Sequence, residues 1–131
     1  MAANERQVVQ TDQAPKAIGP YSQAILAGGM VYASGQVGLD PTTGALVDVS
    51  DIVPQVRRGL DNLRAVLEAA GSDLAHVVKT TVFLVDMNDF TTMNEIYATY
   101  FTDAPPARST VAVHQLPRGA RFEIECIALV K

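Results

Sequence analysis

The sequence predicts an α+β fold in which a mixed β-sheet carries two helices on one face. Two segments, 52–70 and 89–101, repeat apolar residues at helical spacing. The segments around them are rich in β-branched residues or alternate apolar and polar residues, as strands do. A strand lies between the helices, and further strands precede and follow them. Packing both helices on one side of a single sheet is the economical way to bury their apolar faces.

The elements are expected in the order ββαβαββ after a short first strand. The expected strands are 5–10, 24–28, 30–39, 77–86, 108–114 and 121–130, with the helices at 52–70 and 89–101. The segment 11–24 contains two prolines and a glycine, which indicates an ordered loop. The pair Gly28-Gly29 between two strand-like runs is typical of a hairpin.

The helices carry signals for their ends and their buried face. In the first helix the apolar face is formed by residues four or three positions apart: Val56, Leu60, Leu63, Leu67 and Ala70. Ser50 or Asp51 can cap this helix, and Asn88 or Asp89 can cap the second. Gly59 costs about 1 kcal/mol relative to alanine inside a helix. Its place beside the apolar face therefore indicates close approach to the sheet.

The last strand has two faces of different character. One face holds Phe122, Ile124, Cys126, Ala128 and Val130, and the other holds Glu123, Glu125, Ile127 and Leu129. The first face is expected to pack under the helices. The second mixes acidic and aliphatic side chains, which a purely solvated face would not normally do. We therefore expect part of it to meet another subunit.

Composition narrows the class of protein. The 131 residues are 48% hydrophobic and 18% charged, which suits one globular domain over residues 1–131. The net charge of −4 argues against nucleic acid as a partner, because backbone binding relies on Lys and Arg. Residues 1–7 lack the apolar core of a signal peptide, no run approaches the roughly 20 apolar residues of a membrane span, and the single cysteine, Cys126, suits a reducing compartment. We expect a cytoplasmic protein that binds no membrane.

Six blocks, in order, carry a family likeness. They are IGPYSQA (18–24), SGQVG (34–38), NLRAVLEAAG (62–71), VVKTTVFLVDMNDF (77–90), PARSTV (106–111) and LPRGARFEIECIA (116–128). Together they resemble the Rid family of imine deaminases, also called the YjgF family, from about residue 11 to 130. The resemblance implies a chorismate-mutase-like fold, a homotrimer with clefts between subunits, and no cofactor. It also implies hydrolysis of reactive 2-imino or enamino acids, of the 2-aminoacrylate type, to 2-oxo acids and ammonia. This activity would protect the pyridoxal-phosphate enzymes that release such compounds.

Two charged residues are the leading candidates for this chemistry. The family's substrate-carboxylate arginine falls on Arg108, and a guanidinium can hold a carboxylate with two parallel hydrogen bonds. The family's catalytic glutamate falls on Glu123, and a carboxylate can deprotonate the attacking water and return the proton to nitrogen. Glu125 lies on the same strand face, roughly 6.5–7 Å further along. Taken without the resemblance, Arg108 would be an ordinary surface arginine, and both glutamates could be solvated or interfacial.

Further candidates follow from the same blocks. Tyr21 matches the family's active-site tyrosine, although it could be a half-buried loop aromatic. Ser34 and Gly35 map to positions that line the pocket, where glycine permits close backbone approach. Phe90 is either an apolar wall or a core residue. Thr110 stands where many family members have cysteine, so thiol chemistry is not expected at the site.

Alternatives of other classes remain open. A carboxylate-binding regulator would need Arg108 but not Glu123. An endoribonuclease or translation inhibitor, as some similar proteins are labelled, would call for paired acids and bases near a basic groove. His76 and His114 are isolated in the sequence, and there is no cysteine cluster, so we expect no metal site.

Overall fold

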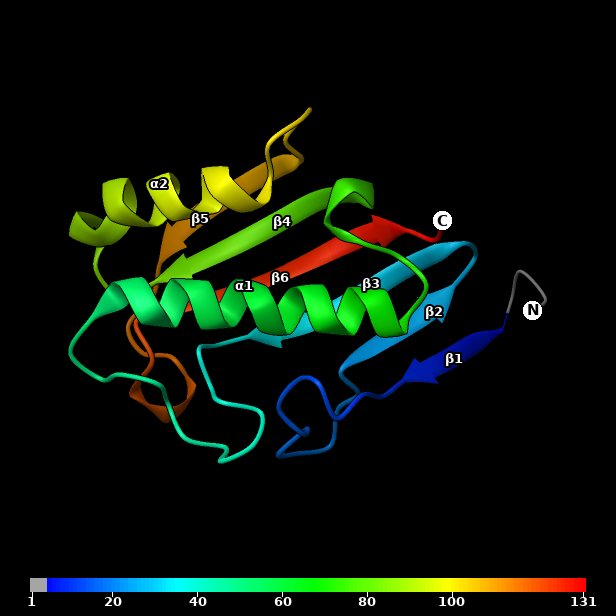
Figure 1. Cartoon of the computed structure of the whole chain (residues 1–131), viewed down its shortest axis with the longest axis horizontal. Coiled ribbons are helices and arrows are strands. Elements are labelled where there is room, and N and C mark those ends of the chain that lie inside the picture. The colour runs from blue at the N-terminus through cyan, green and yellow to red at the C-terminus, as the bar shows by residue number, and fades with distance from the viewer. Residues whose placement is uncertain (1–4) are drawn as a thin grey trace.

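The computed structural model describes residues 5–131, which form one six-stranded sheet and two long helices (Figure 1). Residues 1–4, part of the segment considered for a signal peptide, lie outside the described residues. The strands are β1 (Arg6–Val9), β2 (Ala24–Ala27), β3 (Met30–Gln36), β4 (Val77–Leu84), β5 (Ala107–Ala112) and β6 (Phe122–Leu129). The helices are α1 (Ile52–Ala69) and α2 (Phe90–Tyr100). The expected order of elements is confirmed, with boundaries shifted by up to three residues.

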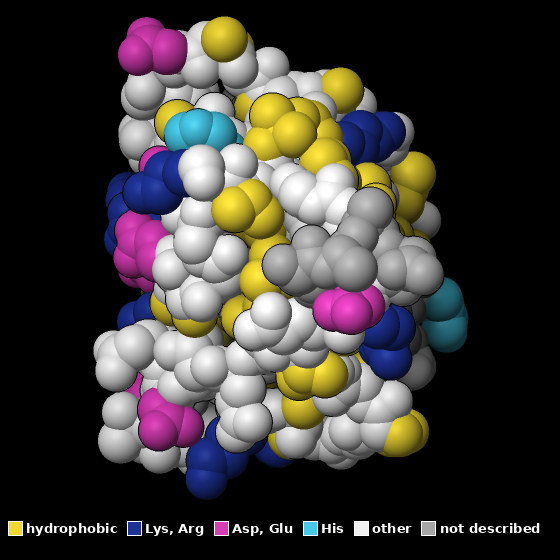
Figure 2. All heavy atoms as spheres, turned by 90° about the vertical axis from the view of Figure 1, so that its right-hand side faces the viewer, with side chains coloured by type: hydrophobic (Ala, Val, Ile, Leu, Met, Phe, Trp, Pro, Cys, Tyr) yellow, Lys and Arg dark blue, Asp and Glu magenta, His cyan; other side chains and the backbone are white. Residues whose placement is uncertain are grey.

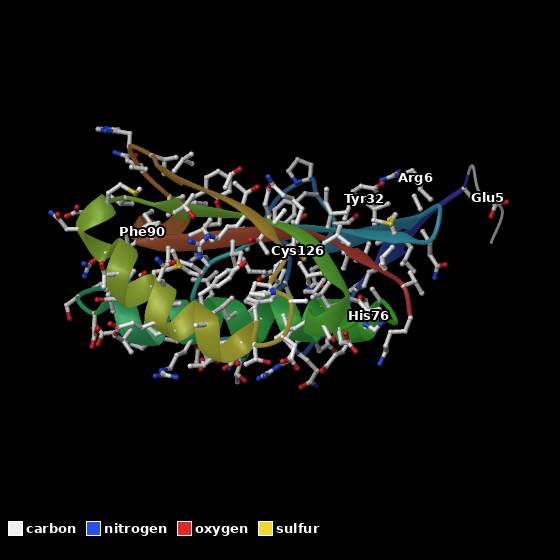
Figure 3. All side chains as sticks on the ribbon, turned by 90° about the horizontal axis from the view of Figure 1, so that it is seen from above. Glu5, Arg6, Tyr32, His76, Phe90 and Cys126 are labelled. Atoms are coloured by element: carbon white, nitrogen blue, oxygen red, sulfur yellow. The ribbon has the colours of Figure 1, made fainter. Side chains whose placement is uncertain are left out.

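The sheet is mixed, and both helices cover the same face of it (Figures 1 and 3). The strand order is β1-β2-β3-β6-β4-β5, and all neighbours are antiparallel except β4 and β5. That parallel pair requires a crossover connection, which α2 supplies. The predicted α+β class, with two helices on one face of a mixed sheet, is therefore confirmed. We call the side under the helices the helix face and the other side the open face.

The first helix is built as its sequence indicates. Asp51 is the cap, and its carboxylate accepts a hydrogen bond from the Val53 N–H at 3.0 Å. The five residues of the predicted apolar face are all buried. A Cβ added at Gly59 would lie 2.9 Å from the ring of Phe122 on β6. The glycine thus permits the helix to approach the sheet, as expected.

At the start of the second helix Asp89, one of the two expected caps, occupies the N-cap position, but its side chain does not cap the helix. Asp86 caps a short 3-10 turn, Met87–Asp89, by accepting from the Asn88 N–H at 2.8 Å. Asp89 precedes α2 but makes no side-chain cap hydrogen bond. Its carboxylate is bonded elsewhere, as described below. Strand β4 ends at Leu84, two residues before the predicted boundary.

Strand β3 also ends early, at Gln36 instead of residue 39. Its pairing with β6 shifts register between Ala33 and Gln36. The chain then leaves the sheet, and the buried Asn62 side chain of α1 donates to the carbonyl oxygens of Val37 and Leu39 at 3.1 and 2.9 Å. These bonds satisfy backbone groups that the strand would otherwise have paired.

Strand β6 confirms the predicted division into two faces. Phe122, Ile124, Cys126 and Ala128 are buried under the helices. Val130 is the exception, because β6 ends at Leu129 and Val130 is exposed. On the open face Tyr32, Val111 and Leu129 are 47%, 42% and 45% exposed. The open face therefore presents large apolar side chains to solvent in the isolated chain, as a subunit contact would require.

No helix within residues 5–131 is long and apolar enough to cross a membrane. Figure 2 looks onto the end of the molecule that carries the C-terminus, where hydrophobic side chains lie among charged ones of both signs.

Candidate functional site

Arg108 lies on the helix face of β5 and rests on two aromatic rings. It pairs in register with the buried Thr80 of β4. Its guanidinium carbon is 4.7 Å from the centre of the Tyr97 ring and 5.6 Å from that of Phe90, both on α2. Within residues 5–131 it forms no ion pair. A guanidinium held on aromatic faces and free of a carboxylate partner is suited to hold an anionic ligand.

The two rings beneath Arg108 are themselves held in place. Phe90 is half-buried and packs against the main core, which agrees with the core interpretation, and its role as a wall of the site stays a prediction. The Tyr97 hydroxyl is 2.8 Å from that of Thr80, and burial, the largest cause, raises the pKa of Tyr97. Sequence reasoning did not select Tyr97 as a site residue. Its spacing of seven from Phe90, two helical turns, was the available signal.

Two buried polar atoms lie on the elements that hold Arg108. The Thr110 hydroxyl oxygen and the Asn94 side-chain oxygen have no hydrogen-bond partner among the described residues. Thr110 follows Arg108 by two residues on the same strand face, and Asn94 lies one turn beyond Phe90 on α2. Unpaired buried polar groups are costly, which makes such positions candidates for ligand or water contacts. Asn94 was not predicted, because an asparagine inside a helix carries no distinctive sequence signal.

Glu123 lies on the open face, against the backbone of β3. It pairs in register with Phe83 of β4. A Cβ added at Gly35 would lie 2.6 Å from its Oε2 atom, so only glycine allows this approach. The carboxyl is half-buried. Desolvation raises its pKa, and the negative charge of Glu125 raises it further.

Ser34 fastens this part of β3 to the loop that carries Tyr21. The Ser34 hydroxyl donates to the Ser22 carbonyl oxygen at 2.6 Å. The backbone N–H of Ser34 donates to the Gln23 carbonyl oxygen at 2.9 Å. Tyr21 itself is 49% exposed, and its hydroxyl accepts from the Ile18 N–H at 3.3 Å. It borders a surface hollow of about 270 Å³ that also includes Lys16 and Ser22. The structure thus places Tyr21 on an exposed loop next to Ser34, without a hydrogen bond to Glu123.

Glu125 is exposed and borders a second hollow on the open face, of about 330 Å³, together with Tyr32, Ser34 and Lys79. It contributes to the pKa of Glu123 through its charge, but it does not share the close contact with Gly35.

The predicted site residues therefore form two groups on opposite faces of the sheet. Arg108, Phe90 and Thr110 belong to the helix face, and Glu123, Gly35 and Ser34 to the open face. Figure 3 shows Phe90 at the start of α2, on the side of the sheet occupied by the helices, and Tyr32 on the other side. One chain does not bring Arg108 and Glu123 to the same point.

No group of three or more His, Cys, Asp or Glu side chains within residues 5–131 is arranged to hold a metal ion. His76 is engaged with Asp73, whose Oδ1 lies 2.6 Å from its Nδ1, and His114 is exposed.

The fold and these residues define a known class of protein. The family model described as Endoribonuclease L-PSP matches residues 11–130, and the chain belongs to this family, which includes the Rid proteins. The chain is 54% identical to the mouse (Mus musculus) 2-iminobutanoate/2-iminopropanoate deaminase over 98% of its own length and 95% of that protein.

Solved structures agree with this assignment. A protein of the conserved Rid family from Yersinia pestis is 50% identical, with a TM-score of 0.93 over 96% of this chain and 100% of that one. The TdcF protein of E. coli, solved with bound serine, is 41% identical, with a TM-score of 0.90 over 95% of this chain and 99% of that one.

Proposed function

We propose that this protein hydrolyses 2-imino acids, and the enamino acids that tautomerise to them, to 2-oxo acids and ammonia. The observation that carries the proposal is Arg108, a guanidinium supported by two aromatic rings and without an ion pair to any of residues 5–131. A second support is the half-buried Glu123 carboxyl with its raised pKa. Relatives named as 2-iminobutanoate/2-iminopropanoate deaminases, from mouse, rat and human, support the same substrate class. The E. coli relative solved with bound serine also supports this substrate class, because serine, like a 2-imino acid, has a carboxylate.

The proposed reaction assigns a separate role to each charged residue. Arg108 binds the substrate carboxylate and orients the C=N bond. Glu123 removes a proton from water as the water oxygen bonds to the imine carbon, and returns that proton to the nitrogen as the double bond opens. In the resulting carbinolamine the hydroxyl proton passes to the nitrogen, by way of Glu123, as the C–N bond breaks, so that ammonia leaves and the 2-oxo acid remains. A raised pKa suits Glu123 to this role, because a base acts best when its pKa is nearer the working pH.

The opposite faces of Arg108 and Glu123 lead us to place the site between subunits. In this arrangement a second copy of the chain presents its Glu123 to the Arg108 of the first. The resemblance suggests a homotrimer with three such clefts. Each chain would contribute one domain with a chorismate-mutase-like fold. The exposed Tyr32, Val111 and Leu129 on the open face would be buried at the contact. Tyr21, Ser34, Gly35 and Thr110 would line the cleft.

A pair of variants tests the division of roles. Arg108→Ala should weaken binding of a 2-oxo acid and abolish turnover, because a charge-assisted contact worth about 2–4 kcal/mol is removed. Glu123→Gln should keep most of the binding and lose turnover, since the amide retains shape but not basicity. Imine would be generated by an amino-acid oxidase and its decay followed, with binding measured by calorimetry. Equal loss of binding in both variants would contradict the assignment.

The same pair separates the alternatives. A carboxylate-binding regulator would lose function with Arg108→Ala and keep it with Glu123→Gln. The name of the matching family and the labels of some relatives favour RNA cleavage as the second candidate. Against it stand the net charge of −4 and the separate environments of the two histidines. We expect no cleavage of single-stranded RNA under conditions where imine hydrolysis is readily measured. We further propose that the protein works in the cytoplasm without a cofactor and protects pyridoxal-phosphate enzymes from their own enamine products.

A further inference from the structure

Asp89 occupies the N-cap position of α2, but its side chain does not cap the helix. Its carboxylate makes no hydrogen bond to the first turn of the helix. Instead both carboxylate oxygens accept from Nη2 of Arg121, each at 2.9 Å. The Asp89 side chain is only 13% exposed, and Arg121 is 33% exposed. Asp89 therefore forms a shielded ion pair in place of the usual capping bond. This ion pair joins the start of α2 to the residue just before β6.

Arg121 is in turn held from two other directions. Its N–H donates to Oε1 of the fully buried Gln55 at 2.8 Å, and its Nη1 donates to the Ser50 carbonyl oxygen at 2.9 Å. Gln55 also donates to the Asp48 carbonyl oxygen at 2.6 Å. The guanidinium that holds Asp89 is therefore anchored to α1 and to the segment before it. Through Arg121, Asp89 is thus tied to the buried Gln55 of α1.

The residue after Asp89 is Phe90, one of the two rings under Arg108. We propose that Asp89 and Arg121 are positioning residues, which set the first turn of α2 and so hold the Phe90 ring where the Arg108 guanidinium stacks on it. This inference rests on the proposed function, since it assigns the ion pair to substrate binding. Neither residue touches the substrate; both act through Phe90 and Arg108.

The test is Asp89→Asn, compared with Asp61→Asn. Asp61 accepts a hydrogen bond from Tyr100 at the other end of α2, at 2.9 Å, and pairs with Arg64, so its loss also loosens the helix. Asp89→Asn should raise the Kd for 2-oxobutanoate and the KM for the imine about threefold to tenfold, with kcat little changed. Asp61→Asn should lower Tm comparably and leave Kd unchanged. A purely structural role for Asp89 would give the same result in both variants, and that result would overturn the inference.

Two further measurements keep the outcome decisive. In a Phe90→Leu background, Asp89→Asn should add nothing to the change in Kd, because both act through one ring. Additive effects would contradict that route. Should Asp89→Asn fail to fold, Arg121→Lys keeps the positive charge and should raise Kd by a smaller factor; an unchanged Kd would also overturn the proposal. Failure of the proposed function is a distinct result, since the unsubstituted protein itself would then neither bind 2-oxobutanoate nor hydrolyse imine.

Discussion

Replacing Gly35 with alanine should separate activity from stability more cleanly than any change to a charged residue. The new Cβ would lie 2.6 Å from Oε2 of Glu123, 2.8 Å from its Cδ and 3.1 Å from its Cγ. Ordinary contact begins at 3.4 Å, so the carboxylate oxygen must retreat by roughly 0.8 Å. The atoms that move form the flexible end of a side chain, and the backbone of Gly35 does not have a positive φ that alanine would resist.

The expected consequence is a large kinetic effect with a small change in stability. Displacement of a reacting group by about 1 Å costs on the order of a hundredfold in rate, or about 2.7 kcal/mol of transition-state stabilisation. The free energy of unfolding should change by no more than about 1 kcal/mol, which corresponds to a few degrees in Tm. The assay is kcat/KM for imine hydrolysis, with thermal unfolding measured on the same preparation.

Gly38→Ala is the matched control. There the Cβ would lie 2.7 Å from the Cα and carbonyl oxygen of Gln55, which are backbone atoms of α1 and cannot turn aside. This variant should lose much of its stability, since the helix itself must shift. Wild-type kcat/KM in a normally folded Gly35→Ala protein would refute the role given to Glu123 at this position.

Three other outcomes follow from the same structure. Activity should fall as the pH drops through the pKa of Glu123, which burial and then Glu125 raise, so the acid limb should lie above the value of about 4.3 for an ordinary glutamate. Glu125→Gln should move that limb to lower pH, and an unmoved limb would exclude the influence of its charge. Burial, with a smaller contribution from the charge of Glu125, raises the pKa of the Cys126 thiol to about 12, so the native protein should resist iodoacetamide. A Thr91→Cys variant, with its new thiol at an exposed position, should react. Rapid labelling of Cys126 in the native protein would contradict its buried placement. Gly59→Ala should lower Tm despite the better helix propensity of alanine, because its Cβ meets a ring of the core at 2.9 Å; a raised Tm would show that this ring yields easily.

Local patterns were sufficient to predict most of the fold. The three- and four-residue spacing of apolar residues identified α1, and the alternation along β6 separated the face with Cys126 from the face with Glu123. At the second helix Asp89 occupies the expected N-cap position, but the expected side-chain capping bond is not made. Any Asp, Asn or Ser near a helix start satisfies the local rule, and only the tertiary structure shows that Asp89 is bound to Arg121, 32 residues later.

The resemblance provided the candidate site residues and the expectation of clefts between subunits, but local sequence patterns did not place Arg108 and Glu123 on opposite faces of the sheet. Alternation along a strand shows which neighbours share a face with Arg108 on β5 or with Glu123 on β6. Whether the two residues share a face depends on the register in which β4 pairs with both β5 and β6. That register is set by long-range pairing that no short segment encodes. Tyr97 was missed for a related reason, because its contact with Arg108 depends on which side of α2 faces β5.

Mixed assemblies can test whether each site combines Arg108 of one subunit with Glu123 of another. Arg108→Ala and Glu123→Gln chains, each nearly inactive alone, would be mixed in equal amounts, unfolded and refolded together. In random mixed assemblies, half of the sites have an intact Arg108 from one subunit. Half of these sites also have an intact Glu123 from the neighbouring subunit, so the mixture should recover about one quarter of wild-type activity. Recovery no greater than that of the separate variants, with mixed assemblies verified by mass spectrometry, would contradict a site shared between subunits.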